Sequence, residues 1–343
     1  MRFTSKTFAA RLVATGISVT LSIAPTFSMA QNISPFQIRN YNPFVQIHGI
    51  PYIGEASTLA KGESRVNLIY ALSSNYAIEQ TETETETLLI DGESTNVTFS
   101  YARGIGKSLQ LAVYLPYVKY DAGNLDGFIN DWHETFNMQQ GGRDLAPINR
   151  LRFLYIRNDI VQMDFVSNSE GLGDISLNAQ LALGDPANTK KESSAVAINL
   201  KLPTGDSASF QGSGAFDLAV WYKHEKKTQL FDSSSGYFYS TGILFMGKGD
   251  VLPDMQKTAV FMVGGGYGLN IGKFFGLKAQ LDYHSPFYSS TEFNELGGHS
   301  LQLVLGASVF FTKTIKLDLG LSEDLIIDAS PDVVFHAAFS AEF

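Results

Sequence analysis

The chain contains no cysteine among its 343 residues. That absence excludes a disulfide framework, thiol catalysis and lipid modification of an amino-terminal cysteine. After residue 30, no run reaches the roughly 18 apolar residues that a membrane-spanning helix needs, so an inner-membrane helical protein is not expected. Basic residues are also outnumbered, with 25 Lys and Arg against 34 Asp and Glu. We therefore expect no nucleic-acid partner.

Residues 1–30 have the three parts of a secretory signal peptide. The basic start contains Arg2, Lys6 and Arg11, residues 12–24 are mainly apolar, and residues 28–30 form a small-residue cleavage site. Cleavage at that site would leave 22 basic residues against 34 acidic ones. The sequence thus predicts an exported, acidic protein that begins at Gln31.

Residues 31–62 form a segment with no steady hydrophobic period. It contains Pro35, Pro43 and Pro51, and proline is excluded from central strands. We expect this stretch to lie on the periplasmic side. It either enters the barrel described below as a plug or extends as an arm along the barrel rim.

Residues 63–343 alternate between apolar and polar side chains, which is the period of a β-strand with two different faces. The alternating segments are 65–72, 97–101, 109–115, 174–183, 196–202, 216–223, 237–245, 259–269, 275–284, 301–311, 315–321 and 333–343. Compact turns, one of them expected at residues 225–227, alternate with longer loops between these segments. Residues 150–165 alternate as well, and we expect them to form an extracellular hairpin extension. The pattern predicts an all-β protein, a transmembrane antiparallel up-and-down β-barrel of about 12 strands. A soluble β-sandwich also alternates, but its strands are usually shorter.

The last segment places Val333, Phe335, Phe339 and Phe343 on its apolar face. This strand resembles the closing strand of Gram-negative outer-membrane barrels, in which a terminal aromatic residue is read by the barrel-insertion machinery. The resemblance implies that this machinery is a partner through Phe343 and that the protein resides in the cell outer membrane, in contact with lipid and lipopolysaccharide. An even strand number then puts both chain ends in the periplasm.

One long loop has helical rather than strand periodicity. Apolar residues recur at three- and four-residue spacing after Asn124, a residue suited to capping a helix. We expect a short extracellular helix over residues 124–138 that narrows the outer mouth. Its candidate residues are Leu125, Asp126, Phe128, Ile129, Trp132, His133 and Phe136. Charged helix surfaces are common and no second histidine is near, so we expect no metal site and no cofactor.

The face opposite the apolar one carries charges of both signs in near balance. The candidate lumen-lining residues are Arg65, Lys201, Asp217, Lys223, Lys278, Asp282, His284, Lys316, Asp318 and His336. An unpaired ion away from water is costly, so these residues indicate either an ion-paired, filled interior or a wetted channel. About twelve strands lie between the filled eight-stranded barrels and open porins, which leaves both alternatives open.

An outer-membrane lipid hydrolase is the competing class. His284–Ser285 and His299–Ser300 are adjacent pairs, but neighbours in a strand point to opposite faces and cannot act as base and nucleophile. A pair formed across two strands is not excluded by this argument. We expect no enzymatic activity.

Several stretches resemble an outer-membrane β-barrel family known as domain of unknown function 3187. They are Leu89-Ile90-Asp91-Gly92-Glu93, Leu125-Asp126-Gly127-Phe128-Ile129 with Trp132, His133 and Phe136, Gly141-Gly142-Arg143, and the prolines Pro35 and Pro43. More loosely, Gly171-Leu172-Gly173-Asp174 and Lys201-Leu202-Pro203-Thr204-Gly205-Asp206 are similar to motifs of outer-membrane transporters of the phenol-degradation type. The resemblance implies the barrel and its location, and implies transport only by analogy.

The sequence therefore predicts a narrow or gated channel, a transporter or a binding protein for an unidentified small solute. The alternatives are a closed structural or surface-interaction barrel and, less favoured, a lipid-modifying enzyme.

Overall fold

The computed structural model describes residues 33–82, 85–136, 147–184, 191–231, 233–325 and 329–343. The expected signal peptide and the Gly141-Gly142-Arg143 motif lie outside the described residues, as do the side chains of Trp132, His133 and Phe136. Within the described ranges, no helix is long and apolar enough to cross a membrane.

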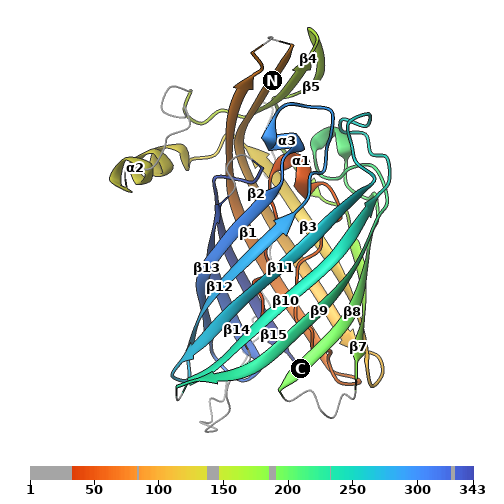
Figure 1. The fold of residues 1–343 in the computed structure, drawn as a ribbon, viewed down its shortest axis with the longest axis vertical. Coiled ribbons are helices and arrows are strands. Elements are labelled where there is room, and N and C mark those ends of the chain that lie inside the picture. Colours follow the sequence, from red (N-terminus) through yellow and green to blue (C-terminus); the bar gives the residue numbers. More distant parts are fainter. Residues whose placement is uncertain (1–32, 83–84, 137–146, 185–190, 232, 326–328) are drawn as a thin grey trace, which may run out of the picture.

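Twelve antiparallel strands form the barrel wall (Figure 1). They are β1 (Ser64–Gln80), β2 (Glu86–Gly104), β3 (Leu109–Asp121), β7 (Ser176–Leu183), β8 (Glu192–Lys201), β9 (Asp217–Leu230), β10 (Ser233–Met246), β11 (Ala259–Ile271), β12 (Phe275–His284), β13 (Ser300–Phe310), β14 (Ile315–Asp324) and β15 (Val333–Glu342). The last strand pairs with the first, from Arg65 opposite Glu342 to Ser74 opposite Val333, and this pairing closes the barrel. The all-β, closed twelve-stranded prediction is confirmed.

The alternation gives every strand of the closed barrel one buried face and one exposed face. In β12, Phe275, Leu277 and Leu281 are about half exposed on the outer surface, whereas Lys278 and Gln280 point inward and are buried. A closed barrel also leaves no unpaired sheet edge, and a barrel in a lipid bilayer needs this because unsatisfied backbone groups are costly there.

The two ends of the barrel differ. Short turns and Phe343 lie at one end, which we call the turn end; long connections lie at the other, which we call the loop end (Figure 1). One predicted turn is wrong: residues 225–227 lie within β9, which continues to Leu230 and pairs with β10 over that length.

The remaining elements belong to the connections at the loop end and to the amino-terminal segment. They are α1 (Pro43–Gln46), α2 (Asp126–Phe136), β4 (Arg152–Arg157), β5 (Ile160–Phe165), β6 (Ser169–Leu172), the 3-10 turn Ser207–Ser209 and α3 (Asn294–Gly297). The β4–β5 hairpin pairs with β2 above the barrel, as the alternation over residues 150–165 predicts.

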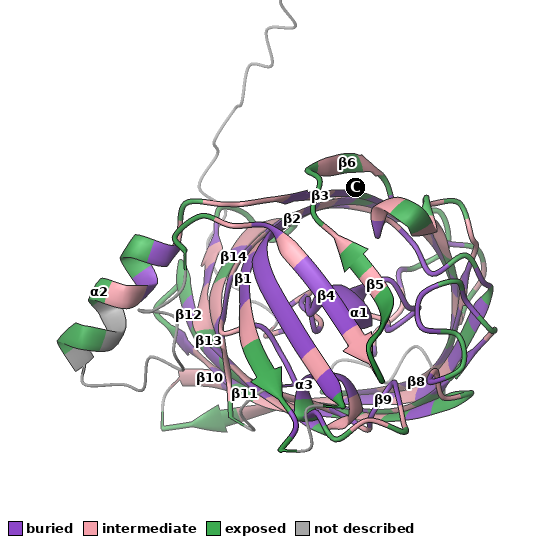
Figure 2. Ribbon diagram, turned by 90° about the horizontal axis from the view of Figure 1, so that it is seen from above, coloured by how far each residue is buried: buried purple, intermediate pink, exposed green. Residues whose placement is uncertain are grey.

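The helix α2 is present, but it lies outside the barrel wall, so the expectation that it narrows the mouth is wrong. Seen from above, the helix projects away from the ring of strands (Figure 2). The physical reason is that its apolar side contacts the outer surface: the ring of Phe128 lies 6.0 Å from that of Phe335 on β15. Ile129 and Asp126 are buried, and the Asp126 carboxylate accepts a hydrogen bond from the amide of Asn149.

Candidate functional site

The barrel interior contains a piece of the chain that is not part of the wall. Residues 33–60, here called the lumen segment, run inside the ring of strands, and their helix α1 lies within that ring (Figure 2). Phe36, Tyr41 and Phe44 have no solvent-exposed surface. The alternative of an arm along the barrel rim is therefore wrong.

The contacts of the lumen segment trace its path. Ser34 meets Lys278 and Lys316 near the turn end, where β14 begins. Asn40 lies beside His284 at the loop-end terminus of β12, with 2.8 Å between Nδ2 and the ring nitrogen Nε2. Glu55 returns to the turn end and binds Arg65. The segment thus climbs the lumen and descends again before β1 begins.

Local interactions within the lumen segment reverse its direction at the loop end. The Asn42 side chain accepts a hydrogen bond from the amide of Phe44, and Pro43 occupies the first turn of α1, where a missing amide proton costs nothing. The Asn40 side chain accepts from the amide of Asn42 and donates to the carbonyl of Ala329. Two asparagines and a proline thus turn the chain and fasten it to the loop before β15.

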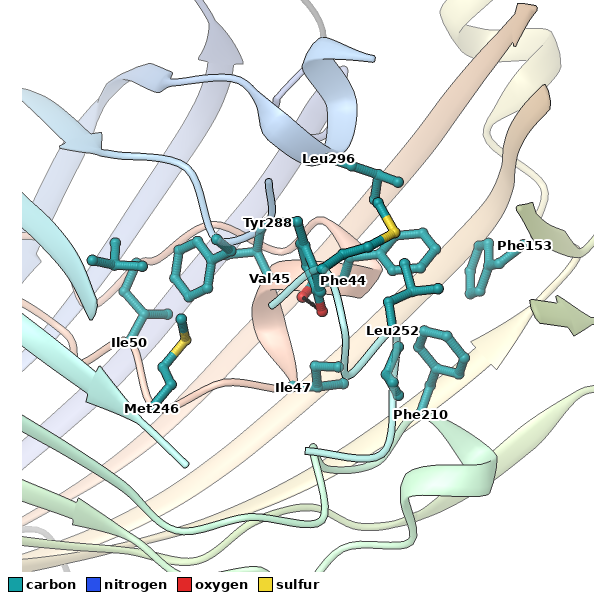
Figure 3. Close-up of a cluster of buried hydrophobic side chains, with 14 of the residues drawn as sticks. Phe44, Val45, Ile47, Ile50, Phe153, Phe210, Met246, Leu252, Tyr288 and Leu296 are labelled. Carbon is teal, nitrogen blue, oxygen red and sulfur yellow. Dashed lines mark hydrogen bonds between the residues drawn. The ribbon is translucent and has the colours of Figure 1, made fainter. Parts of the chain in front are cut away.

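An apolar cluster closes the loop end around α1 (Figure 3). Phe44 packs edge-on against Phe210 and Tyr288, with ring centroids 5.7 and 6.3 Å apart. Burial and the nearby Asp217 carboxylate raise the pKa of Tyr288, so its hydroxyl stays protonated and donates to the carbonyl of Phe44. Members of this loop-end cluster that come from loops include Phe210, Val251, Leu252, Met255, Phe287, Tyr288, Phe293 and Leu296.

Below the cluster, a buried charge network holds the descending part of the lumen segment. The Lys201 ammonium contacts Asp174 directly and Asp217 at 3.5 Å. The Gly49 amide donates to Asp217 at 2.8 Å. A Cβ added at Gly49 would lie 2.9 Å from the Asp217 Cβ, so glycine allows the backbone to approach the wall this closely.

A second buried pair lies on the turn-end side of the lumen. Lys278 Nζ is 2.8 Å from Asp318, and neither side chain is exposed. The same ammonium lies 3.9 Å from the centre of the Phe36 ring, a cation–π contact with the lumen segment. The His336 ring packs edge-on against this phenyl ring, with the ring centroids 6.0 Å apart.

The carboxylate of Glu55 joins the lumen segment to two wall cations. It lies 2.6 Å from Arg65 and 3.2 Å from Lys316. Arg65 also contacts Glu342 at 2.6 Å, the residue opposite it in the β1–β15 pairing.

The structure places all ten candidate lumen-lining residues on the inward side. Lys223 donates to Gln180, and Asp282 accepts from Gln280, while the other eight take part in the contacts described above. Sequence reasoning missed the partners that the lumen segment supplies, Glu55 above all. Arg39 and Glu55 are the only Asp, Glu, Lys or Arg residues between positions 33 and 60, and such isolated charges in a Pro- and aromatic-rich stretch could have indicated them.

Small cavities lie between the lumen segment and the wall. Four cavities among the described residues have volumes of about 20, 30, 40 and 50 Å³. A water molecule needs at least about 10–15 Å³ by this measure, so each holds only a few waters. A far larger hollow of about 1010 Å³ lies on the outer surface of β11–β15, lined by residues such as Leu277, Leu305 and Leu319, and does not belong to the lumen.

A serine–histidine pair does form across two strands, on the outer surface near the turn end. Ser194 Oγ lies 3.0 Å from His224 Nδ1, and Glu192 lies 3.7 Å from the other ring nitrogen. The histidine ring stacks on Tyr239 at 4.9 Å, and the Tyr222 hydroxyl donates to Ser194. Acyl transfer also requires donors for an oxyanion, whereas β8 and β9 pair with each other throughout this region. The arrangement matches the aromatic girdle of a membrane barrel.

A family model described as "Protein of unknown function (DUF3187)" matches residues 12–343. No curated protein matches. The COG4313 outer membrane channel from Pseudomonas putida F1 superposes on 84% of this chain and 98% of its own, with 13% identity and a TM-score of 0.54. The Pseudomonas putida toluene transporter TodX covers 90% and 99% with 9% identity, but its TM-score of 0.35 is too low to support an argument. The similarity to the COG4313 channel is therefore a similarity of fold.

Proposed function

Because this chain belongs to the DUF3187 family and shares its fold with a solved outer-membrane channel, we propose that it is an outer-membrane channel for a small solute. In the conformation described here the channel is closed, and the lumen segment is the plug. We place the protein in the outer membrane of a Gram-negative cell, exported by a signal peptide cleaved after residue 30.

The observation that carries this proposal is how the plug is held. The strand ladders close the barrel without the lumen segment. Among the described residues, the one isolated β-bridge near the segment pairs Lys61 with Gly104 at the rim of the barrel. Ion pairs, hydrogen bonds of backbone amides and packing in the loop-end cluster hold the lumen segment itself in place. Withdrawal of the segment would therefore leave the wall intact and open a lumen lined with both signs of charge.

The test is conductance of refolded protein in planar bilayers. Wild-type protein is expected to show rare openings, and a variant lacking residues 33–60 is expected to conduct steadily. Deletion of residues 123–140, which removes α2 from the outer surface, serves as the matched control and should behave like the wild type. A correctly folded barrel that lacks residues 33–60 and still passes no current would overturn the channel proposal.

The second candidate is a closed structural or surface-interaction barrel. The paired interior charges and the apolar loop-end cluster favour it, since both stabilise a sealed state. It predicts no current from either deletion variant, together with protease-accessible loops on whole cells. A lipid-modifying activity is the third candidate. It would require detergent-solubilised protein to alter phospholipid or lipopolysaccharide by mass spectrometry, and Ser194→Ala to abolish that change.

A further inference from the structure

The turn-end half of the lumen carries an excess of positive charge on its wall. The wall cations there are Arg65, Lys223, Lys278 and Lys316, and the wall carboxylates are Glu225, Asp318 and Glu342. Among those described wall groups that are not solvent-exposed, four cations therefore face three carboxylates. The missing negative charge is supplied by Glu55, which belongs to the lumen segment and not to the wall.

The geometry around Glu55 is that of a binding site for a carboxylate. Its two oxygens are held separately, one by the Arg65 guanidinium at 2.6 Å and the other by the Lys316 ammonium at 3.2 Å. Glu55 and Arg65 side chains are only 14% exposed, so bulk water screens the pair weakly. Charge-assisted contacts of this kind are stronger than hydrogen bonds between neutral groups.

A third cation is available at the same place. Lys223 lines the cavity of about 40 Å³ that Glu55, Arg65 and Lys316 also line. Its ammonium donates to the neutral amide oxygen of Gln180, and no carboxylate within the described ranges lies within 4 Å of it. Amide side chains from the wall, including Asn67, Gln110 and Asn178, complete the lining and can donate to an anion.

We propose that Arg65, Lys316 and Lys223 form a site for a small carboxylate solute, and that Glu55 occupies this site as an internal ligand while the channel is closed. This inference rests on the proposed channel function and names its solute class. A carboxylate solute competes with Glu55 for the same cations, so binding of the solute and seating of the plug exclude each other. The solute thereby favours the open channel, because it binds only the state from which Glu55 has withdrawn.

The first experiment measures binding directly, without conductance. Glu55→Ala removes the internal carboxylate and leaves a space the size of a short carboxylic acid. Isothermal titration of the refolded variant with sodium propionate is expected to show binding at least about tenfold tighter than to wild-type protein, a difference of about 1.4 kcal/mol. Propionamide, which has the same shape without the charge, should not bind. Glu63→Ala removes an exposed carboxylate just outside the lumen and serves as the control.

Adding Lys316→Gln to Glu55→Ala should weaken propionate binding at least about tenfold, because one of the two cations that hold the carboxylate is lost. Both variants keep the wall pairings, and migration on gels before and after heating verifies that each barrel is folded. Equal binding of propionate and propionamide, or equal binding by the Glu55→Ala and Glu63→Ala variants, would overturn the site.

The second experiment separates this inference from the proposed function. In planar bilayers with a salt gradient, the barrel lacking residues 33–60 is expected to prefer anions, and Lys316→Gln should reduce that preference several-fold. Conductance without anion preference would refute the site and leave the channel standing. Propionate binding by Glu55→Ala together with no conductance from the deleted barrel would refute the channel and leave the site standing.

Discussion

Phe44 at the centre of the loop-end cluster allows a quantitative test of whether the lumen segment moves independently of the barrel. Its side chain is fully buried, and it packs against Phe210 and Tyr288, which come from two different loops. Replacing a buried phenylalanine by alanine typically costs about 3–5 kcal/mol, from lost burial and from the cavity that remains. For Phe44→Ala, we expect this loss of free energy to weaken docking of the lumen segment and to leave the stability of the barrel wall unchanged.

The reason is topological. Phe44 belongs to α1, which contributes nothing to the strand ladders that hold the wall. A loss of about 3–5 kcal/mol corresponds to a shift of about 150-fold to 4,000-fold in the equilibrium between docked and undocked segment. Hydrogen exchange over residues 33–60 should accelerate by that factor in refolded protein, while exchange in the wall strands and the unfolding midpoint of the barrel stay unchanged.

The matched control is Phe275→Ala, which removes the same ring from the outer surface, where the side chain is 53% exposed. It should leave exchange in the lumen segment unaffected. If Phe44→Ala lowered the unfolding midpoint of the whole barrel and left exchange of residues 33–60 no faster than that of the wall, the segment and the wall would unfold as one unit. The independent plug would then be refuted.

Three further outcomes follow from the ion pairs and from the close approach of the segment. Lys278→Met leaves the unexposed Asp318 carboxylate without its nearest cation, so urea unfolding should show a loss of about 3–5 kcal/mol. Lys248→Met breaks a pair of similar length with Asp254, 3.0 Å apart, but both side chains are mainly solvated and the urea midpoint should not change. Gly49→Ala forces a Cβ against the wall and should speed cleavage of the lumen segment by added protease, with the barrel core intact; unchanged cleavage would contradict the close approach.

Much of the wall could be predicted from the sequence because its determinant is local. An alternation such as that of β12 assigns each residue a face without knowledge of its partners, and on that basis the sequence predicts that Lys278 and His284 face the lumen. The number of alternating segments, with compact turns alternating with longer loops, likewise predicts a closed barrel. The helix α2 was likewise indicated by the spacing of its apolar residues.

Only the tertiary structure determines what each irregular or helical segment packs against. The apolar face of α2 could have met the mouth or the outer wall, since periodicity describes a face and not its partner; the contact of Phe128 with Phe335 puts it outside. Residues 33–60 have no period at all, and their place in the lumen depends on residues far away in the chain. Glu55 meets Lys316 across 261 positions of sequence, a pairing that no local pattern encodes and that only the closed barrel brings about.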